Sequence, residues 1–543
     1  MKNTLYYGDN LDILREYIPS ESVDLIYLDP PFNSKRTYNV LFKHEDGQDS
    51  QAQMAAFEDT WHWNIEAERT YHELVTEAPD NVAQMIAALR QFIGTNQMLA
   101  YLVMMAIRLV ELHRVLKLTG SLYLHCDPTA SHYLKIVLDA IFGADKFVNE
   151  IIWKRTGAHT HANRFAPNSD TILFYSKSTD FIWNPQFIDH SEEYINSKYR
   201  HNDNDGRGQY TLDNLTAVGV RPNLMYEWKG HESPARGWRY SFEKMTELDA
   251  NGYIWYPDSK SKRPRRKRYL KDIKGKALDT IWTDIFPLNS QAKERLGYPT
   301  QKPVELLKRI VEASSNKGDI VLDPICGCGT TISAAQELGR TWIGIDVTFL
   351  ATSLIKYRLK DQFPDAQYKV VGEPTTLAAA KHLALQDRFQ FEWWALPLVG
   401  ARPIGGESGS KKGKKGADQG VDGFINFIDD ASGKPKRIIV QVKSGKVNSA
   451  TIRDLGGTTQ REKAAIGILI TLNRPTKPMQ REAASAGFYH SSGWNQDYPK
   501  IQILTVEQLL DGKLPDMPPN KVTFAKAVKV QKKTKQKQLG LGI

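Results

Sequence analysis

Strand-like and helix-like stretches alternate along the first part of the chain. Residues 22–28 (SVDLIYL) form a short run rich in strand-favouring residues, and 121–125 (SLYLH) predict a buried strand. Residues 97–118 are a long helix candidate, and 130–142 predict another helix that ends at Gly143. Strands and helices that alternate in this way indicate a wound α/β sheet.

The regular pattern loosens in the middle of the chain and returns after Gln301. Polar, aromatic and basic residues dominate from about 150 to 285, which fits an inserted region better than a core sheet. The elements predicted after this region are helices over 304–314 and 331–338, strands over 320–322 and 341–345, and helical sequence to about 400.

A second, smaller α/β unit is predicted near the end of the chain. Residues 405–416 are rich in Gly, Ser and Lys and predict a flexible loop. Strands are predicted over 423–428, 437–442 and 466–471. The predicted fold class is α/β, with five segments: 1–150, 151–290, 291–365, 385–515, and a tail over 516–543.

The composition of the chain indicates what class of protein it is and in which compartment we expect it. The chain has 543 residues, 41% hydrophobic and 25% charged, as expected of a globular protein with more than one domain. The N-terminus lacks the apolar stretch of a signal peptide, and the apolar run 98–107 is too short to span a membrane, so we expect a cytoplasmic protein without a membrane partner. The three cysteines, Cys126, Cys326 and Cys328, argue against a disulfide framework and against a zinc site.

The net charge of +10 favours a polyanionic partner. Seven lysines between 521 and 537 face no acidic residue, and their simplest interpretation is a solvated tail. A denser run in mid-chain is better suited to contacts with nucleic-acid phosphates. Its members are Lys262, Arg263, Arg265, Arg266, Lys267 and Arg268.

A glycine-rich turn at 321–331 (VLDPICGCGTT) joins a predicted strand to a predicted helix, and the next strand ends at Asp346. Glycines let a backbone approach a ligand closely, and a carboxylate about twenty residues further on can accept hydrogen bonds from ribose hydroxyls. Asp323 precedes the glycines, where it would repel a pyrophosphate. A carboxylate there suits a ligand with a cationic amino group and a sulfonium, such as S-adenosylmethionine. The alternative is a purely structural turn.

The tetrapeptide Asp29-Pro30-Pro31-Phe32 directly follows the strand-like run 22–28. The two prolines stiffen the turn and hold one side chain and one carbonyl in place. The Asp29 carboxylate and the Pro30 carbonyl can accept both N–H groups of an exocyclic amine and orient its nitrogen for attack on a methyl group. Phe32 can stack on a base flipped out of a duplex. A strand-terminating turn is the alternative.

These motifs together resemble the amino-methyltransferases of DNA in their circularly permuted β arrangement. The tetrapeptide comes first, the irregular region second, and Gln301-Lys302-Pro303 and the Asp323 loop last, so the resemblance covers roughly residues 1–360. It implies a Rossmann-like sheet whose catalytic half is 1–150 and whose cofactor half is 291–365. Residues 151–290 would be the target-recognition region, and double-stranded DNA would be the partner.

The resemblance also implies roles for individual residues. Gly8, Asp9 and Asn10 would contact the adenine ring of S-adenosylmethionine, and Asp346 its ribose. Trp153, Lys154 and Arg155 resemble the strand beside the target-base pocket. Ile325 and Cys328 depart from the family pattern. The remaining cofactor contacts that the resemblance implies are Gln301, Lys302, Pro303, Asp323, Pro324, Gly327, Gly329 and Thr330.

A second constellation occupies 385–515 and resembles the Mrr-like branch of the PD-(D/E)xK nucleases. Asp422, Gln441 and Lys443 match its pattern, and Glu392 would supply a missing carboxylate from a helix. The resemblance implies magnesium at Asp422 and a restriction–modification protein with a fused endonuclease. The alternative is a nuclease-like fold that only binds DNA.

Three further alternatives stay open on the sequence. The acidic residue that opens the tetrapeptide is typical of members that methylate adenine N6, but cytosine N4 is the second candidate. RNA is disfavoured by the size of the insert. A DNA-binding protein that keeps the fold without the chemistry is a different class. The sequence also leaves open whether the chain forms a homodimer.

Overall fold

The computed structural model describes residues 1–31, 62–156, 163, 165, 167–289, 292, 294, 296, 298, 300–403, 421–429 and 435–519. Its contacts divide the chain into two compact units, Met1–Asn184 with Thr280–Ile543, and Pro185–Asp279. The first unit holds a large sheet and a separate C-terminal sheet, and the second holds a small sheet of its own.

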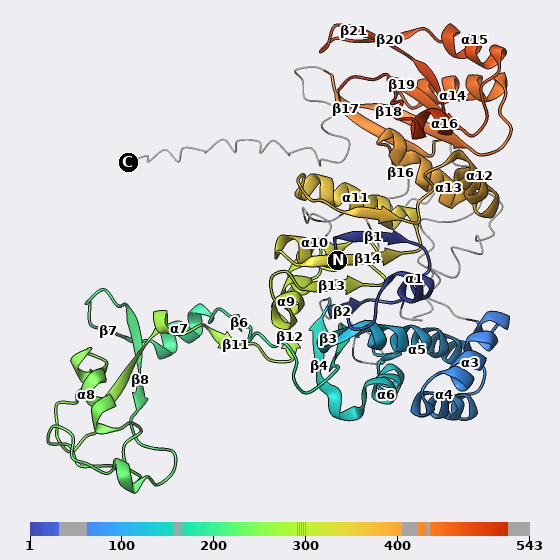
Figure 1. Ribbon diagram of the computed structural model, residues 1–543. Coiled ribbons are helices and arrows are strands. Elements are labelled where there is room, and N and C mark those ends of the chain that lie inside the picture. The colour runs from blue at the N-terminus through green and yellow to red at the C-terminus, as the bar shows by residue number, and fades with distance from the viewer. Residues whose placement is uncertain are drawn as a thin grey trace, which may run out of the picture. The chain divides into compact units, whose positions relative to one another are not determined.

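The large sheet is mostly parallel, as expected for a wound α/β domain, and Figure 1 shows its strands side by side. Only β5 runs antiparallel to its two neighbours. In spatial order the nine strands are β12 (Ile281–Trp282), β4 (Phe147–Lys154), β5 (Ser169–Ser176), β3 (Leu116–Cys126), β2 (Val23–Leu28), β13 (Ile320–Asp323), β14 (Thr341–Asp346), β1 (Thr4–Tyr7) and β15 (Lys369–Val371).

Helices pack their buried apolar side chains against this sheet. The longest, α5 (Gln97–Val115), begins where the Asn96 side chain accepts a hydrogen bond from the Leu99 N–H at 3.0 Å, and eleven of its residues are buried. It ends before 118 because Leu116 adopts an extended conformation and opens β3. The other helices of this domain are α1 (Asn10–Tyr17), α3 (Ile65–Glu77), α4 (Asp80–Ile93), α6 (Ser131–Phe142), α9 (Val304–Ser314), α10 (Thr330–Glu337) and α11 (Phe349–Gln362).

The unit Pro185–Asp279 has its own small core. Trp238 is fully buried there, and its indole N–H donates to the Tyr226 carbonyl at 2.7 Å. Trp228 also packs into this core, so both tryptophans support the fold of the unit. The elements are a sheet in the order β7 (His201–Asn202), β8 (Gln209–Asn214), β10 (Arg265–Tyr269), β9 (Ile254–Trp255), the pair β6 (Phe187–Ile188) and β11 (Lys276–Ala277), and helices α7 (Glu192–Lys198) and α8 (Phe242–Ala250).

The segment predicted as the recognition region, 151–290, is thus divided between the two units. Strands β4, β5 and β12 add residues on both sides of Pro185–Asp279 to the large sheet. Only the part between them forms the separate unit.

The C-terminal sheet contains β16 (Arg402–Pro403), β17 (Gly423–Ile428), β18 (Pro435–Lys443), β19 (Ile466–Thr471) and β22 (Ile501–Thr505), in that order. Its strands β18, β19 and β22 are parallel. Apolar side chains of α12 (Leu377–Gln386) and α13 (Arg388–Ala395) pack in one core cluster with this sheet, and α14 (Ser449–Arg461) and α15 (Lys477–Ser485) pack in another. The pair β20 (Phe488–Ser491) and β21 (Gln496–Pro499) and helix α16 (Val506–Leu510) complete the domain. Across the described ranges, none of the helices combines the length and the apolar character that crossing a membrane requires.

Candidate active site

The motifs singled out in the sequence lie at the ends of four neighbouring strands of the large sheet, at one edge. Strand β2 pairs in parallel with β13, β13 with β14, and β14 with β1. Because parallel strands end at the same edge of a sheet, the turns after them lie next to one another. Asp29 follows β2, Asp323 ends the neighbouring β13, and Asp346 ends β14. Asp29 and Asp323 therefore follow neighbouring parallel strands.

The glycine turn after Asp323 is fixed by backbone contacts. The Gly327 N–H donates to the Asp346 carboxylate at 2.9 Å, and the Cys326 N–H donates to the Ile345 carbonyl at 3.0 Å. Gly329 has a φ of 73°, and a Cβ there would lie 2.6 Å from the Ile355 Cγ1. Only glycine adopts this left-handed conformation without strain so close to the Ile355 side chain of α11.

The segment Gly8-Asp9-Asn10 joins the same edge. The Gly8 N–H donates to the Asp346 carbonyl at 3.0 Å, and the Asn10 amide donates to the Pro324 carbonyl at 2.9 Å. Arg108 of α5 donates to the Asn10 side chain at 2.6 Å and pairs with Asp9 at 2.9 Å. Sequence reasoning missed Arg108, whose only signal is a charge that interrupts an apolar helix.

Arg358 of α11 is a second residue that the sequence did not reveal. Its guanidinium is buried and donates to the Cys328 carbonyl and the Thr330 hydroxyl, both at 3.2 Å. Burial lowers the pKa of this arginine. These hydrogen bonds stabilise the glycine turn, because they hold the two residues on either side of Gly329.

Two buried carboxyl groups give this edge its electrostatic character. Burial raises the pKa of Asp323 to about 7, although Thr331 and the Ile325 N–H donate hydrogen bonds to it, and the nearby Asp29 and Asp346 raise it further. Burial likewise raises the pKa of Asp346 to about 6, against hydrogen bonds from Thr348 and Gly327. A cation placed beside Asp323 would favour its charged form.

Asp29 is held by a lysine from a distant part of the chain. Its Oδ2 forms an ion pair with Lys302, and both side chains are largely buried. Its Oδ1 is buried and, among the described residues, accepts no hydrogen bond. Pro30 is buried beside it, and Phe32 lies outside the described residues. An unsatisfied buried acceptor is costly unless a ligand donates to it.

The neighbours of Lys302 position the segment that carries it. The Gln301 side chain accepts from the Leu296 N–H at 2.8 Å and donates to the Glu294 carbonyl at 2.7 Å. Pro303 precedes the first residue of α9. The Gln301 side chain therefore holds the backbone of residues 294–301 in a closed loop. Of the three residues of this motif, Lys302 is the one that contacts Asp29.

A buried polar chain extends from β2 across β3 and β5. The Tyr27 hydroxyl and the His125 Nδ1 lie 2.9 Å apart, and the His125 Nε2 and Asp170 lie 3.1 Å apart. Arg155 pairs with Asp170 at 3.2 Å, and the Trp153 ring meets His125 edge to face. Although burial would raise it, the hydrogen bond from His125 lowers the pKa of Asp170. Trp153 lies on β4, which β5 and β3 separate from β2, Arg155 directly follows β4, and Lys154 is exposed.

The basic run 262–268 is only partly free to meet DNA. Lys267 pairs with Asp203, Arg268 pairs with Asp213 at 3.5 Å, and Arg266 donates to the Tyr240 hydroxyl at 2.6 Å. These three side chains support the fold of the unit Pro185–Asp279. The side chains of Lys262, Arg263 and Arg265 are exposed.

The structure brings together some of the residues predicted as a nuclease-type site in the C-terminal domain. Asp422 precedes β17, whose Gly423 pairs with Val440 of β18, so Asp422 lies beside Gln441. Its carboxylate accepts the Val442 N–H at 2.7 Å. Gln441 and Lys443 alternate with Val440 and Val442 along β18 and point to the opposite face.

Glu392 lies on α13, which packs on the face of Val440 and Val442. Gln441 and Lys443 instead line a cavity with α14. The part of Glu392 in a site with Gln441 and Lys443 stays a prediction, as does magnesium binding at Asp422. The basic tail 516–543 lies outside the described residues from position 520 onward.

Comparison with known proteins agrees with this geometry. The Type II methyltransferase M.EcaI of Enterobacter cloacae is 33% identical over 362 residues, which cover 66% of this chain and 69% of that protein. The Type III Mod subunit StyLTI of Salmonella typhimurium is 27% identical, and the match covers 62% of this chain but only 50% of the subunit. The DNA adenine methyltransferase YhdJ of Escherichia coli K12 is 25% identical over 63% of this chain and 78% of that enzyme.

Two family models match different parts of the chain. One, described as a NACHT-associated inactive restriction endonuclease, matches residues 407–511. The other, described as DNA methylase, matches residues 23–349, which include the Asp29 turn, the Lys302 segment and the Asp323 turn. The chain therefore belongs to the DNA methylase family and is a DNA methyltransferase.

Proposed function

We propose that this DNA methyltransferase transfers a methyl group from S-adenosylmethionine to the exocyclic N6 of adenine in double-stranded DNA. The observation that carries the proposal is the state of Asp29. One of its oxygens is held by Lys302, and the other is a buried acceptor without a partner among the described residues, beside the Asp323 turn. An exocyclic amine is the donor that fits such an acceptor.

The edge of the sheet also fits the cofactor. Asp323 is a buried carboxyl whose pKa is about 7, and a cationic amino group would relieve the cost of its burial. The glycine turn keeps Cβ atoms away from the backbone beside it. Asp346 and Asn10 supply polar groups at the ends of the adjoining segments. When bound, S-adenosylmethionine supplies an electrophilic methyl group on a sulfonium.

The residues of the chain would act on the target amine. The free Asp29 Oδ1 and the Pro30 carbonyl accept the two N–H groups, which turns the nitrogen lone pair toward the cofactor side. Lys302 keeps the carboxylate from rotating, because its ammonium holds the other oxygen. The Asp29 carboxylate is also the group placed to receive the proton that the methylated nitrogen must lose.

Adenine is favoured over cytosine by two observations. The tetrapeptide opens with an aspartate, which resembles members that methylate adenine N6. A relative named as a DNA adenine methyltransferase also matches 63% of the chain. Cytosine N4 is the second candidate, because it presents the same kind of exocyclic amine.

The test is to methylate plasmid DNA with the purified chain, digest it to nucleosides and identify the modified one by mass spectrometry. We expect N6-methyl-2′-deoxyadenosine from the wild-type chain and none from Asp29→Ala. The variant must still bind the cofactor, which shows that it is folded. N4-methylcytosine would overturn the choice of base, and unchanged methylation by Asp29→Ala would overturn the mechanism.

The relatives belong by name to Type II and Type III systems, and a role in restriction–modification is part of the proposal. Magnesium-dependent cleavage by the C-terminal domain is not. Its matched family is described as inactive, and Gln441 offers an amide, as in the Mrr-like branch, in place of the usual acidic residue of PD-(D/E)xK nucleases. Incubating unmethylated plasmid with the chain and magnesium tests it, with Lys443→Ala as the comparison. Cleavage by the wild type alone would restore the nuclease prediction.

A further inference from the structure

The helix α13 of the C-terminal domain contacts the cofactor half of the methyltransferase. Gln390 of this helix is 3% exposed, and its side-chain oxygen accepts the Phe349 N–H at 3.1 Å. Phe349 is the first residue of α11, and the first N–H groups of a helix have no partner within it. The DNA methylase family matches up to residue 349 and the other matched family starts at residue 407. Gln390 therefore lies between the segments that the two families cover.

The turn that Gln390 holds joins α11 to Asp346, the carboxylate at the end of β14. One oxygen of Asp346 accepts the Thr348 N–H at 2.9 Å and the Thr348 hydroxyl at 2.8 Å, and the other accepts the Gly327 N–H at 2.9 Å. The Thr348 hydroxyl in turn accepts the Ala351 N–H at 3.3 Å. The position of the Asp346 carboxylate therefore depends on the first turn of α11.

Phe349 also supports the end of the neighbouring strand β1. Its ring stacks on the Tyr7 ring, with 3.7 Å between the ring centroids and 18° between the planes. Tyr7 ends β1, and the next residue, Gly8, donates its N–H to the Asp346 carbonyl at 3.0 Å. Burial and then the nearby carboxylates of Asp387 and Asp346 raise the pKa of Tyr7. The ends of β1 and β14 therefore both depend on where Phe349 lies.

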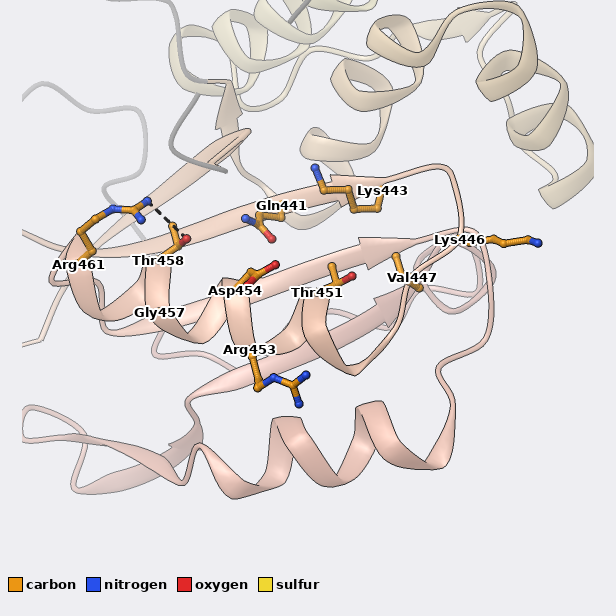
Figure 2. Close-up of a pocket in the computed structure, with 10 residues that line it drawn as sticks. All are labelled: Gln441, Lys443, Lys446, Val447, Thr451, Arg453, Asp454, Gly457, Thr458 and Arg461. Carbon is orange, nitrogen blue, oxygen red and sulfur yellow. Dashed lines mark hydrogen bonds between the residues drawn. The ribbon is translucent and has the colours of Figure 1, made fainter. Parts of the chain in front are cut away.

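One apolar core joins α13 to the C-terminal sheet and to the start of α11 (Figure 1). Among its members are Phe349 and Leu350 of α11, Phe391 and Trp394 of α13, and Ile425, Phe427, Ile438 and Val440 of the sheet. The opposite face of β18 carries Gln441 and borders a separate polar cavity (Figure 2). The connection between the C-terminal sheet and α11 therefore does not involve that cavity.

We propose that Gln390 is a positioning residue for cofactor binding, so that the C-terminal domain forms part of the cofactor site. The proposal rests on the proposed function, because there Asp346 is a cofactor contact. While Gln390 accepts the Phe349 N–H, the turn after β14 keeps the conformation in which Asp346 accepts the Gly327 N–H. Without this acceptor the buried N–H is unpaired, and the turn leaves that conformation in most molecules. A site that is competent in only a fraction of the molecules binds its ligand more weakly by that fraction.

The experiment uses the full chain and replaces Gln390 with methionine, which keeps the length of the side chain and removes the oxygen. Affinity for S-adenosylhomocysteine is measured by calorimetry, and methyl transfer by steady-state kinetics on a DNA duplex. We expect roughly tenfold weaker binding and a roughly tenfold higher KM for S-adenosylmethionine, the size expected when a buried N–H loses its acceptor. The kcat should be unchanged, because Asp29 is held by Lys302 and not by α13.

The matched control is Gln502→Met. Gln502 is a second buried glutamine of the C-terminal domain, and its side-chain oxygen accepts the Asp516 N–H at 2.9 Å. The control removes the same kind of hydrogen bond, but on β22 rather than at the start of α11. We expect the wild-type affinity for S-adenosylhomocysteine and the wild-type KM. Comparable melting temperatures of the two variants exclude general destabilisation as the cause of a difference in affinity.

Hydrogen–deuterium exchange tests the same coupling in the wild-type chain. Coupling between two binding events is reciprocal, so a cofactor that requires the contact of Gln390 must also stabilise it. S-adenosylhomocysteine should slow the exchange of backbone amides in α13, and this protection should be absent in Gln390→Met. Equal exchange of α13 in the wild type with and without the ligand would contradict the coupling.

Three further results would overturn the proposal. They are an unchanged affinity in Gln390→Met, an equal loss of affinity in Gln502→Met, and a lower kcat at an unchanged KM. The modified nucleoside is identified on the same preparations. N4-methylcytosine together with weaker cofactor binding by Gln390→Met would refute the proposed base alone. N6-methyl-2′-deoxyadenosine together with unchanged binding by Gln390→Met would refute the role of Gln390 alone.

Discussion

Replacing Asp323 with asparagine isolates the contribution of one buried carboxyl group to cofactor binding. Burial raises the pKa of Asp323 to about 7 from an ordinary value of 3.8. Keeping it ionised in the free protein therefore costs ~4 kcal/mol, at about 1.36 kcal/mol per pKa unit. The wild-type group carries a proton at pH 6 and must release it when a cationic amino group binds.

The sign of the pH effect follows from this release. Below pH 7 the affinity for the cofactor should fall by up to about tenfold for each unit of pH, and above pH 8 it should level off. In Asp323→Asn no proton can be released, so the slope disappears. At pH 8 the variant also lacks a charged hydrogen bond that contributes about 1.5–3 kcal/mol, which corresponds to a loss of roughly 10- to 150-fold.

The assay is isothermal titration calorimetry with S-adenosylhomocysteine, which keeps the amino acid moiety and lacks the methyl group. Titrations between pH 6.5 and 8 in two buffers of different protonation enthalpy give the number of protons released. The control Glu312→Gln alters an exposed carboxylate on α9 and should behave as the wild type. No proton release by the wild type at pH 6.5, or the same slope in Asp323→Asn, would refute the reasoning.

The remaining predictions address the carboxylate anchor, the glycine turn and the DNA contacts. Lys302→Gln frees the Asp29 carboxylate to rotate, so single-turnover methylation should slow by ~100-fold while cofactor affinity changes little; a normal rate would argue against the anchor. Gly329→Ala places a Cβ 2.6 Å from the Ile355 Cγ1, which should destabilise the fold by about 1–3 kcal/mol in denaturant unfolding; an unchanged midpoint would contradict the packing argument. Three exposed cations are neutralised together: Lys262, Arg263 and Arg265. The slope of log DNA affinity against log salt should become shallower by about three. An unchanged slope would show that these residues do not contact DNA.

Local sequence patterns were sufficient where one element carries its own signal. The helix over 304–314 and the strands over 423–428 and 466–471 have the bounds expected of them. The helix that starts at Gln97 stops three residues early, because Leu116 pairs with Val23 of β2 and opens β3 rather than continue the helix. Strand β5 was not expected, and of β4 only a strand at Trp153 and Lys154 was implied by the resemblance. Their pairing with β3 depends on distant partners, which local periodicity does not encode.

Some features of the candidate site could likewise be predicted from local sequence, and others depend on contacts between distant residues. The strand-end turns at Asp29 and Asp323 could be placed together from sequence, since parallel strands share an edge. The contact between Lys302 and Asp29 could not, because it joins residues 273 positions apart and depends on the loop that Gln301 closes. Arg108 and Arg358 were missed for the same reason, as each acts only through a turn packed against its helix.

The insertion of Pro185–Asp279 into the large sheet has an evolutionary consequence. Just outside it, Asn184 donates to the carbonyls of Glu312 and Ser315 at 2.9 and 3.0 Å, and the Thr280 carbonyl accepts the Ile152 N–H at 2.8 Å. Both junctions are thus fastened to the catalytic scaffold by atoms that do not belong to the inserted cassette. Exchange of the segment Pro185–Asp279 by recombination at these two junctions would leave the hydrogen bonds of Asn184 and Thr280 to the scaffold unchanged.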